Sequence, residues 1–331
     1  MKNICFIIPY FGTLPNYFPL FLKSCQSNPN YNWFLITDDR TEYDYPSNVK
    51  VLYKSFSDTR KYIQTKFDFN INLNSAYKLC DYKPAYGYIF EEYIEGFLFW
   101  GYCDLDIILG NLDDFISIDR ICNYDKIFSL GHMTLYRNSY DLNRVFKKRL
   151  NNRLIYKEAF TTDNIYRFDE VGEINNNNID GIYCNERLRV YSIDHSLNIN
   201  NRKIAFSRVV FKGIEEYPSE KGFDIENAFR SITLWNHGSI ERYYIREGRL
   251  ITSKHPYIHL QSRKMLFNCK VLNADIIKII PNEFRAFPYE SITLLNFYLI
   301  SSHSRNRKYY LTYVKEKWRD IKSFFYLLLF H

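Results

Sequence analysis

Two aspartates, Asp104 and Asp106, follow directly on the apolar run 97–103 (FLFWGYC) and are separated by one residue. An aromatic-rich apolar run of this length predicts a buried strand. Open α/β sheets bind ligands beyond the carboxyl ends of their strands, so these carboxylates are the leading candidates for chemistry. Carboxylates placed in this way can hold Mn²⁺ or Mg²⁺, and such a cation neutralises a departing diphosphate. The alternative is a solvated or helix-capping pair.

The segment 255–264 (HPYIHLQSRK) contains two histidines four residues apart, followed by two basic residues. Its proline and its alternating pattern favour a strand or loop, where that spacing does not build a helical zinc site. We therefore expect His259 alone to join the two aspartates on one cation, and Arg263 and Lys264 to reach the diphosphate. The alternative for His259 is a purely structural role.

The block 77–88 (YKLCDYKPAYGY) carries three charged residues among aromatic ones and leads into the aspartate strand. We predict that Lys78 and Lys83 meet a phosphate and that Asp81 orients one of them or contacts sugar hydroxyls. A helix with these charges on its solvated face is the alternative.

A second acidic pair, Asp38 and Asp39, ends the apolar run 32–37 (NWFLIT). If the first two strands flank a nucleotide pocket, carboxylates here can accept hydrogen bonds from ribose hydroxyls or from a base N–H. An ordinary turn is equally compatible with the pattern, because aspartate favours turns.

An inverting transfer reaction also needs a carboxylate that takes a proton from the attacking hydroxyl. We select Asp169 and Glu170, in the sequence RFDEVG, as the candidates for this general base. Asp180 and Asp194 remain open as alternatives.

The elements that must position these residues alternate in type. Strands are predicted at 2–10, 32–37, 49–53 and 97–103, and helices at 16–26, 58–66 and 75–94. This alternation is typical of an α/β fold with a parallel sheet. Further along, 126–136 is strand-like, 230–262 alternates like hairpins that turn at Gly238 and Gly248, and the residues from 273 onward look helical.

Length and composition limit the class of protein. At about 150 residues per domain, 331 residues make two domains, or one large α/β domain with an extension. A hydrophobic fraction of 46% with 24% charged residues excludes a disordered or collagen-like chain. The seven cysteines are odd in number and form no C-x-x-C pair, which favours a reduced, cytoplasmic compartment. No apolar run is long enough for a membrane-spanning helix.

The positive charge is concentrated in the tail. Residues 305–331 carry seven basic and two acidic residues, which accounts for +5 of the chain's net charge of +7. A nucleic-acid binder would spread such charge over a face of its body, so we expect no nucleic-acid partner. Because the basic residues precede the apolar run Phe324–Phe330, we predict attachment to an anionic membrane surface. The alternative is a terminal helix packed on the rest of the protein.

Several familiar signatures are absent from the sequence, namely G-x-G-x-x-G, the P-loop, H-E-x-x-H and G-x-S-x-G. Their absence argues against dinucleotide enzymes, P-loop NTPases, zinc proteases and serine hydrolases.

Over residues 3–265 the chain resembles the bacterial glycosyltransferases of O-antigen and capsule biosynthesis that have a GT-A fold. The motifs that carry this resemblance are IIPYFG, FLITDD, KLCDYKPAYG, FWGYCDLDIILGN and HPYIHLQSRKM. The block around Asp104 and Asp106, with the segment before it, is the most specific of these.

The resemblance implies roles for individual residues. It assigns the binding of Mn²⁺ or Mg²⁺ and of the donor diphosphate to Asp104 and Asp106. Asp38 matches the acidic position beside the nucleoside, and His259 matches the late histidine that completes the metal shell. Asp169 and Glu170 match the base of inverting members only loosely.

The resemblance also implies an organisation and a function. We expect a GT-A-type, Rossmann-like mixed sheet flanked by helices over residues 1–270, and a basic helical extension over 271–331. The enzyme would transfer a sugar, with galactose or galactofuranose favoured, from a UDP-sugar to a lipid-linked glycan at the inner face of the cytoplasmic membrane. One alternative is a sugar-nucleotidyltransferase, although the N-terminal loop has one glycine and no basic residue, where a triphosphate needs a glycine-rich, basic loop. The other is a non-catalytic glycan-binding module.

Overall fold

The computed structural model describes residues 2–170, 177–192, 194–199, 206–211, 223–227 and 229–302, together with Leu311, Val314, Lys315 and Trp318. In these residues the protein is of the mixed α/β class, with helices and three sheets. The chain divides into two compact units. The first comprises Met1–Ile107, Leu112–Asp194 and Val210–Asp224, and the second comprises Ile108–Asn111, His195–Val209 and Ile225–His331.

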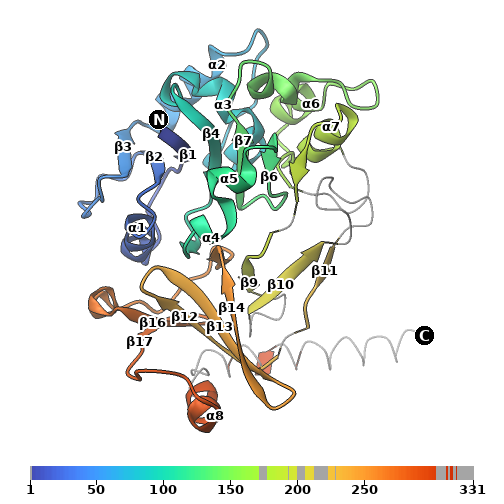
Figure 1. Ribbon diagram of the computed structural model, residues 1–331. Helices are drawn as coiled ribbons and strands as arrows, with labels where there is room; N and C mark the ends of the chain where they lie inside the picture. Colours follow the sequence, from blue (N-terminus) through green and yellow to red (C-terminus); the bar gives the residue numbers. More distant parts are fainter. Residues whose placement is uncertain are drawn as a thin grey trace. The chain divides into compact units, whose positions relative to one another are not determined.

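The first unit is built on a seven-stranded sheet with the order β3-β2-β1-β4-β7-β6-β8 (Figure 1). Its strands are β1 (Lys2–Pro9), β2 (Tyr31–Thr37), β3 (Val49–Tyr53), β4 (Phe97–Cys103), β6 (Lys126–Ile127), β7 (Met133–Arg137) and β8 (Val190–Tyr191). The first four are parallel to one another, and β7 runs antiparallel to β4. The predicted parallel arrangement of the first four strands is therefore confirmed.

The strand order contains a topological switch point between β1 and β4. From β1 the sheet grows through β2 to β3 on one side, and then continues with β4 on the other side of β1. The loops that follow β1 and β4 therefore diverge at one edge of the sheet. Open α/β sheets bind ligands at such a switch point.

Helices cover one face of this sheet. The helices of the first unit are α1 (Phe18–Gln26), α2 (Phe56–Gln64), η1 (Ala76–Ala85), α3 (Tyr86–Ile89), η2 (Glu91–Tyr93), α4 (Asp113–Ile116), α5 (Ile118–Ile121), η3 (Leu142–Lys147), α6 (Ile155–Thr161) and α7 (Ile179–Asn185). Apolar residues of α2, η1, α3, η3, α6 and α7 form one core with strand residues such as Ile7 and Trp100. This core holds the sheet edge in a fixed shape.

The segment 75–94 differs from the single helix that its apolar spacing predicts. It consists of the 3₁₀ helix η1, one turn of α-helix and a second 3₁₀ turn. Pro84 lies inside η1, where it removes a backbone donor and prevents a regular α-helix. Residues three apart are aligned in a 3₁₀ helix, so Lys78 and Asp81 share one face.

Two five-stranded sheets make up most of the second unit, with the orders β11-β10-β9-β15-β5 and β14-β13-β12-β16-β17. The elements are β5 (Ile107–Leu109), β9 (Leu197–Ile199), β10 (Phe206–Phe211), β11 (Phe223–Ile225), β12 (Ser231–Asn236), β13 (Ser239–Arg246), β14 (Arg249–His255), β15 (Tyr257–His259), η4 (Cys269–Asn273), β16 (Ile276–Ile280), β17 (Glu283–Ala286) and α8 (Leu294–Ser302).

The predicted hairpins of 230–262 are confirmed as the antiparallel strands β12, β13 and β14 (Figure 1). Both turns have two residues with positive φ, His237 and Gly238 in the first and Glu247 and Gly248 in the second. This is the geometry that lets a two-residue loop follow the twist of the strands it joins. Glycine supplies it without steric cost.

The expectation of a helical segment from 273 onward, and with it a helical extension over 271–331, is wrong for the residues immediately after 273. Ile276–Ile280 and Glu283–Ala286 are strands, and β16 pairs antiparallel with β12. The run IIKII is β-branched apart from its lysine, which favours a strand. A helix begins only at Leu294.

Most of the basic tail 305–331 lies outside the described residues. Among those that are described, no helix combines the length and the apolar content needed to cross a membrane.

Candidate functional site

Lys83 connects two of the predicted carboxylates in the first unit. Its Nζ lies 2.9 Å from Oδ1 of Asp104 and 3.2 Å from Oδ2 of Asp169, and it donates a hydrogen bond of 2.7 Å to the carbonyl of Gly131. The backbone N–H of Asp104 is held by the carbonyl of His132 at 2.9 Å. The end of η1, the end of β4 and the segment before β7 therefore meet at one point.

The charge of Lys83 is maintained by this arrangement. Burial alone would lower the pKa of its ammonium group, but the carboxylates of Asp104 and Asp169 outweigh burial and raise the pKa well above the ordinary value. The ammonium group also lies 5.0 Å from the centre of the Tyr102 ring, a cation–π contact. Lys83 is thus a fixed positive charge beside the predicted cation ligands.

Asp169 and Glu170 are adjacent in sequence but differ in their surroundings. Asp169 is 1% exposed, and its burial, with smaller contributions from Glu170 and Asp104, raises the pKa to about 7 against the opposing effect of Lys83. Its Oδ1 has no hydrogen-bond partner among the described residues. Glu170 is exposed.

Gly131 passes so close to these two carboxylates that no larger residue fits. A Cβ at this position would lie 2.7 Å from Cγ of Glu170 and 2.9 Å from Oδ2 of Asp169. The glycine therefore permits the close approach of the two acidic residues to the start of β7.

Lys78 and Asp81 form a buried ion pair of 2.7 Å, with side chains 2% and 0% exposed. Asp81 also accepts hydrogen bonds from the backbone N–H groups of Tyr166, at 2.9 Å, and Phe168, at 3.3 Å, while Lys78 donates to the carbonyl of Asn164. The pair thus fixes the segment that leads into Asp169. The predicted contacts of Lys78 and Asp81 with a ligand remain predictions.

Asp38 and Asp39 hold the loop that follows β1. Oδ1 of Asp38 accepts a hydrogen bond of 2.8 Å from the N–H of Gly12, and Oδ2 of Asp39 accepts one of 2.9 Å from the N–H of Leu14. The hydrogen bonds from Leu14 and Thr41 lower the pKa of Asp39. Both aspartates thus lie at the carboxyl edge of the sheet, and their contact with a nucleotide stays a prediction.

Asp106 lies close to the same loop. Its side chain is 8% exposed. Burial, together with the negative charge of Asp106, raises the pKa of Tyr10 and of Tyr17. The pair Asp104 and Asp106 therefore leaves β4 beside the loop after β1, at the switch point of the sheet.

In the second unit, His259 ends β15 and its Nδ1 lies 3.0 Å from Oδ1 of Asn198. Because an amide oxygen can only accept, Nδ1 carries the proton and Nε2 carries the lone pair. This is the tautomer of a metal-binding histidine whose other nitrogen is held by a neighbour. The donor chemistry of His259 therefore fits the predicted cation.

His255 has a structural environment. Its ring nitrogens contact the carbonyl of His195 at 2.7 Å and Oγ of Ser253 at 2.9 Å. Burial lowers the pKa of His255 to about 3, so the ring is neutral. The sequence-based exclusion of a helical zinc site made of the two histidines agrees with the strand geometry of this segment.

Chain connectivity relates Asp106 to His259. Asp106 is followed at once by β5, and β5 is the neighbour of β15 in its sheet. The N–H of Gly110, just after β5, donates to the carbonyl of Pro256, just before β15, so the two strands run in opposite directions. The start of β5, which Asp106 directly precedes, is thus opposite the end of β15. That Asp104, Asp106 and His259 hold one cation together stays a prediction.

Arg263, Lys264 and Asp180 were also predicted to act at the site, and each has other surroundings. Arg263 donates to Oδ1 of Asn282 at 3.1 Å and burial lowers its pKa, while Lys264 is exposed. Asp180, an alternative base, forms a buried ion pair of 2.5 Å with Lys126. A role of Arg263 and Lys264 toward a diphosphate stays a prediction.

Sequence reasoning did not identify Gly131 or the contact of Lys83 with Asp169. These residues are far apart along the chain, and no local pattern connects them. The only local signal is a single glycine inside the predicted strand segment 126–136.

No curated protein matches this chain. A family model does match, over residues 6–288, which is most of the chain. The protein therefore belongs to DUF6625, a family of unknown function.

Proposed function

We propose that this protein is a metal-dependent glycosyltransferase of the GT-A type, which transfers a sugar from a UDP-sugar to a lipid-linked glycan. The observation that carries the proposal is the position of Asp104 and Asp106, which leave β4 at the switch point beside β1. The strand order β3-β2-β1-β4 and the loop held by Asp38 and Asp39 support a nucleotide site at this edge.

The candidate ligand set fits a divalent cation. Two carboxylates and an imidazole are oxygen and nitrogen donors that suit Mn²⁺, and carboxylates also suit Mg²⁺. When bound, the cation would neutralise the charge that develops on a leaving diphosphate.

Lys83 would assist by fixed electrostatics. It is charged, largely buried and held by Asp104, Asp169 and the carbonyl of Gly131. A positive charge that is already oriented stabilises a developing negative charge without reorganisation during the reaction.

The exposures of the two candidate bases suggest different roles. Asp169 is buried against Lys83 and would set the position of that lysine. Glu170 is exposed beside it and could take the proton of an acceptor hydroxyl. We therefore propose that Glu170→Gln retains donor binding and loses turnover.

The function is tested by thermal-shift titration of UDP-sugars with and without Mn²⁺, beginning with UDP-galactose and UDP-galactofuranose. The proposal expects stabilisation that requires both the nucleotide and the metal, and that is lost in Asp106→Asn. Metal-independent glycan binding without UDP binding would support a glycan-binding module instead. Stabilisation by UTP with a sugar phosphate would support a sugar-nucleotidyltransferase.

We also propose that the basic tail attaches the enzyme to the inner face of the cytoplasmic membrane. The described tail residues Leu311, Val314 and Trp318 are helical and exposed, and their spacing of three and four places them on one helix face. Each basic residue near an anionic surface contributes about 1 kcal/mol.

Sedimentation with phosphatidylglycerol vesicles tests this proposal. The variant Lys315→Gln/Lys317→Gln/Arg319→Gln should sediment less than the wild type while remaining active on a soluble acceptor. Equal sedimentation of the two proteins would reject the attachment.

A further inference from the structure

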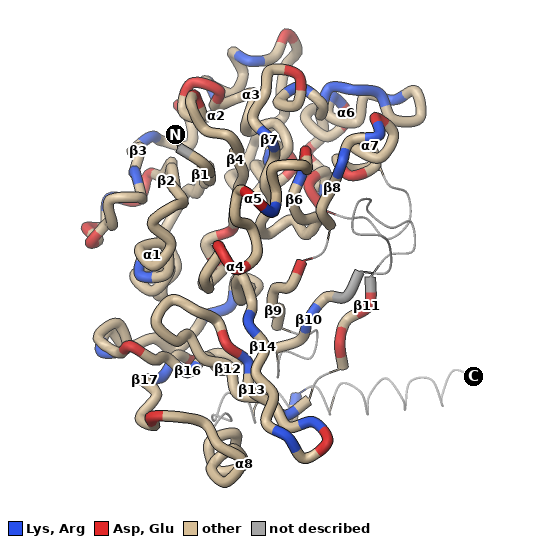
Figure 2. The backbone as a smooth tube through the Cα atoms, in the orientation of Figure 1, with Lys and Arg blue, Asp and Glu red and all other residues tan. Residues whose placement is uncertain are grey.

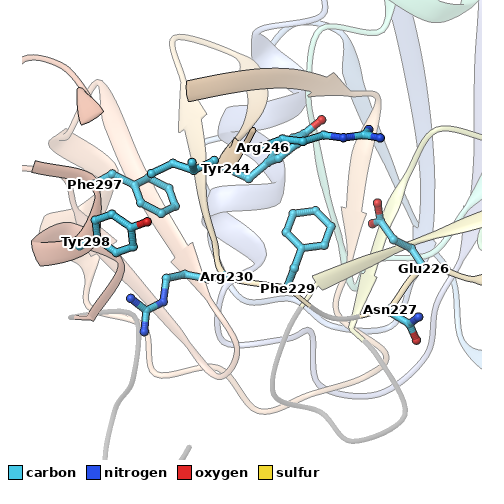
Figure 3. A pocket seen from close by; sticks show the side chains of 9 residues that line it. Glu226, Asn227, Phe229, Arg230, Tyr244, Arg246, Phe297 and Tyr298 are labelled. Carbon is cyan, nitrogen blue, oxygen red and sulfur yellow. The ribbon is translucent and has the colours of Figure 1, made fainter. Parts of the chain in front are cut away.

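The second unit contains a pocket whose lining includes none of the predicted site residues. Its cavity has a volume of about 500 Å³, which lies within the range of small-ligand sites. Side chains from the segment after β11, from β13 and from α8 surround it (Figure 3). Those that the argument uses are Glu226, Phe229, Arg230, Tyr244, Arg246 and Tyr298.

A buried arginine, Arg242, holds two of the side chains that line this pocket. Arg242 is 2% exposed and donates to Oε2 of Glu226 at 2.7 Å, and the same oxygen accepts the N–H of Arg208 at 3.2 Å. The guanidinium of Arg242 also lies 4.8 Å from the centre of the Phe229 ring. The carboxylate and the ring are thus held before any ligand arrives, which lowers the entropy cost of binding.

The pocket offers flat apolar surfaces next to polar groups. Phe229 and Tyr298 are 37% and 56% exposed, and Phe229 meets Tyr244 edge to face at 5.1 Å. The guanidinium of Arg230 lies 5.6 Å from the centre of the Tyr298 ring, and the ring faces turned away from the arginines can stack on the C–H face of a sugar ring. The amide of Asn227 and the carboxylate of Glu226, which line the same cavity, can bond with its hydroxyls.

The charge of the lining favours an anionic ligand. The negative charge of Glu226 is balanced by Arg242, whereas Arg230 and Arg246 are both exposed and positive. Arg246 lies 3.9 Å from Glu247 at the tip of hairpin β13–β14, where Figure 2 shows charges of both signs. An exposed pair of this kind binds weakly, so Arg246 can exchange it for a ligand carboxylate or phosphate.

We propose that this pocket binds an acidic sugar of a glycan, with its ring on Phe229 and Tyr298 and with carboxylate or phosphate groups on Arg230 at one end of the pocket and on Arg246 at the other (Figure 3). The inference deepens the proposed function and rests on it, because this sugar would belong to the acceptor glycan. It names an acidic glycan as the acceptor class.

The test is calorimetric titration of the full chain with three probes: a glucuronate-containing tetrasaccharide, mannose 6-phosphate and neutral maltotetraose. The acidic probes should bind, and the neutral one at least about tenfold more weakly. Preference for one of the two acidic probes identifies the carboxylate or the phosphate as the natural group. Equal binding of the neutral probe, or no binding of either acidic probe, would overturn the proposal.

Variants locate the binding. Arg246→Ala and Arg230→Ala should each weaken binding of the acidic probe at least about tenfold, and both residues are exposed, so folding should be kept. Arg249→Ala is the matched control, because Arg249 is exposed opposite Arg246 in the same hairpin but does not line the cavity. An equal effect of all three substitutions would show general electrostatic attraction and reject the site.

Asp106→Asn separates this inference from the proposed function. The variant should bind the acidic glycan as the wild type does, whatever its effect on UDP-sugars. If the protein binds the acidic glycan but shows no metal-dependent binding of UDP-sugars, the pocket proposal stands and the glycosyltransferase proposal is rejected. If it binds UDP-sugars with metal but not the glycan, the glycosyltransferase proposal stands and the pocket proposal is rejected.

Discussion

The Nζ of Lys83 lies 3.2 Å from Oδ2 of Asp169, a carboxylate that is almost completely buried. The same ammonium group lies 2.9 Å from Asp104 at the end of β4. One side chain thus joins the helical segment before β4, the strand end and the acidic pair near residue 170.

Replacing Lys83 should destabilise the fold as well as the site. Lys83→Met leaves the carboxylate of Asp169 buried without its counter-charge, and breaking one side of a buried pair costs about 3–5 kcal/mol. Urea unfolding measures the loss. The double variant Lys83→Met/Asp169→Asn should recover most of it, because no buried charge is left unpaired. A loss below about 1 kcal/mol for the single variant would contradict the contact.

The pKa of Asp169 predicts a pH dependence of stability. The group titrates near 7 in the folded protein and near 4 in the unfolded chain. Between these values the folded state holds more protons, so its contribution to stability is fully present below pH 4 and is lost as the pH rises toward 7.

The slope from this one group can reach about 1.4 kcal/mol per pH unit. Denaturant melts from pH 4.5 to 8 should show a shallower decline for Asp169→Asn than for the wild type. Parallel curves for the two proteins would exclude the raised pKa.

The buried pair of Lys78 and Asp81 should be far more sensitive to substitution than a surface pair with the same spacing. Lys78→Ala leaves Asp81 unpaired in the core and should cost about 3–5 kcal/mol. Lys61→Ala is the matched control, because Lys61 pairs with Asp58 at 4.0 Å on the surface and should cost at most about 1 kcal/mol. Similar midpoints in thermal unfolding for the two variants would contradict the burial of the first pair.

Both candidate metal ligands that follow β4 should contribute to cation binding. Asp104→Asn and Asp106→Asn should each reduce Mn²⁺ affinity by at least about tenfold, or 1.4 kcal/mol, because each removes a negatively charged oxygen ligand. Competition of Mn²⁺ against a fluorescent metal indicator provides the measurement. Unchanged affinity in either variant would contradict the assignment of that residue.

The strands of the first sheet were predictable because their residues carry a strong local signal. The apolar runs of β1, β2 and β4 are bounded by turn residues, and each is buried on both faces. Gly238 and Gly248 marked the hairpin turns for the same reason, since a positive φ has a recognisable residue preference.

The failures of prediction have equally local causes. The stretch 126–136 contains two short strands, β6 and β7, because Phe128 adopts a positive φ that ends the first one. The strand β16 was not predicted because its apolar run contains Lys278, and a lysine is usually exposed. Here it is 5% exposed and donates to the carbonyl of Ile300 at 2.6 Å.

The candidate site was predictable only in part. The position of Asp104 and Asp106 directly after β4 was predictable, because both follow one strongly apolar strand, and their role at a site stays a prediction. The bridge from Lys83 to Asp169 depends on how η1 and the segment 164–168 pack together, and no spacing in the sequence records that packing.

The second unit includes four residues, Ile108–Asn111, that lie in the sequence between two segments of the first unit. Within that unit the carbonyl of Leu109 accepts from Nε1 of Trp235 at 3.0 Å, and a Cβ on Gly110 would lie 2.4 Å from the carbonyl of His255. A gene fragment that encodes only the C-terminal half would therefore lack a strand that its own sheet requires. Recombination at a single junction cannot exchange one unit and keep the other, so the two must be inherited together.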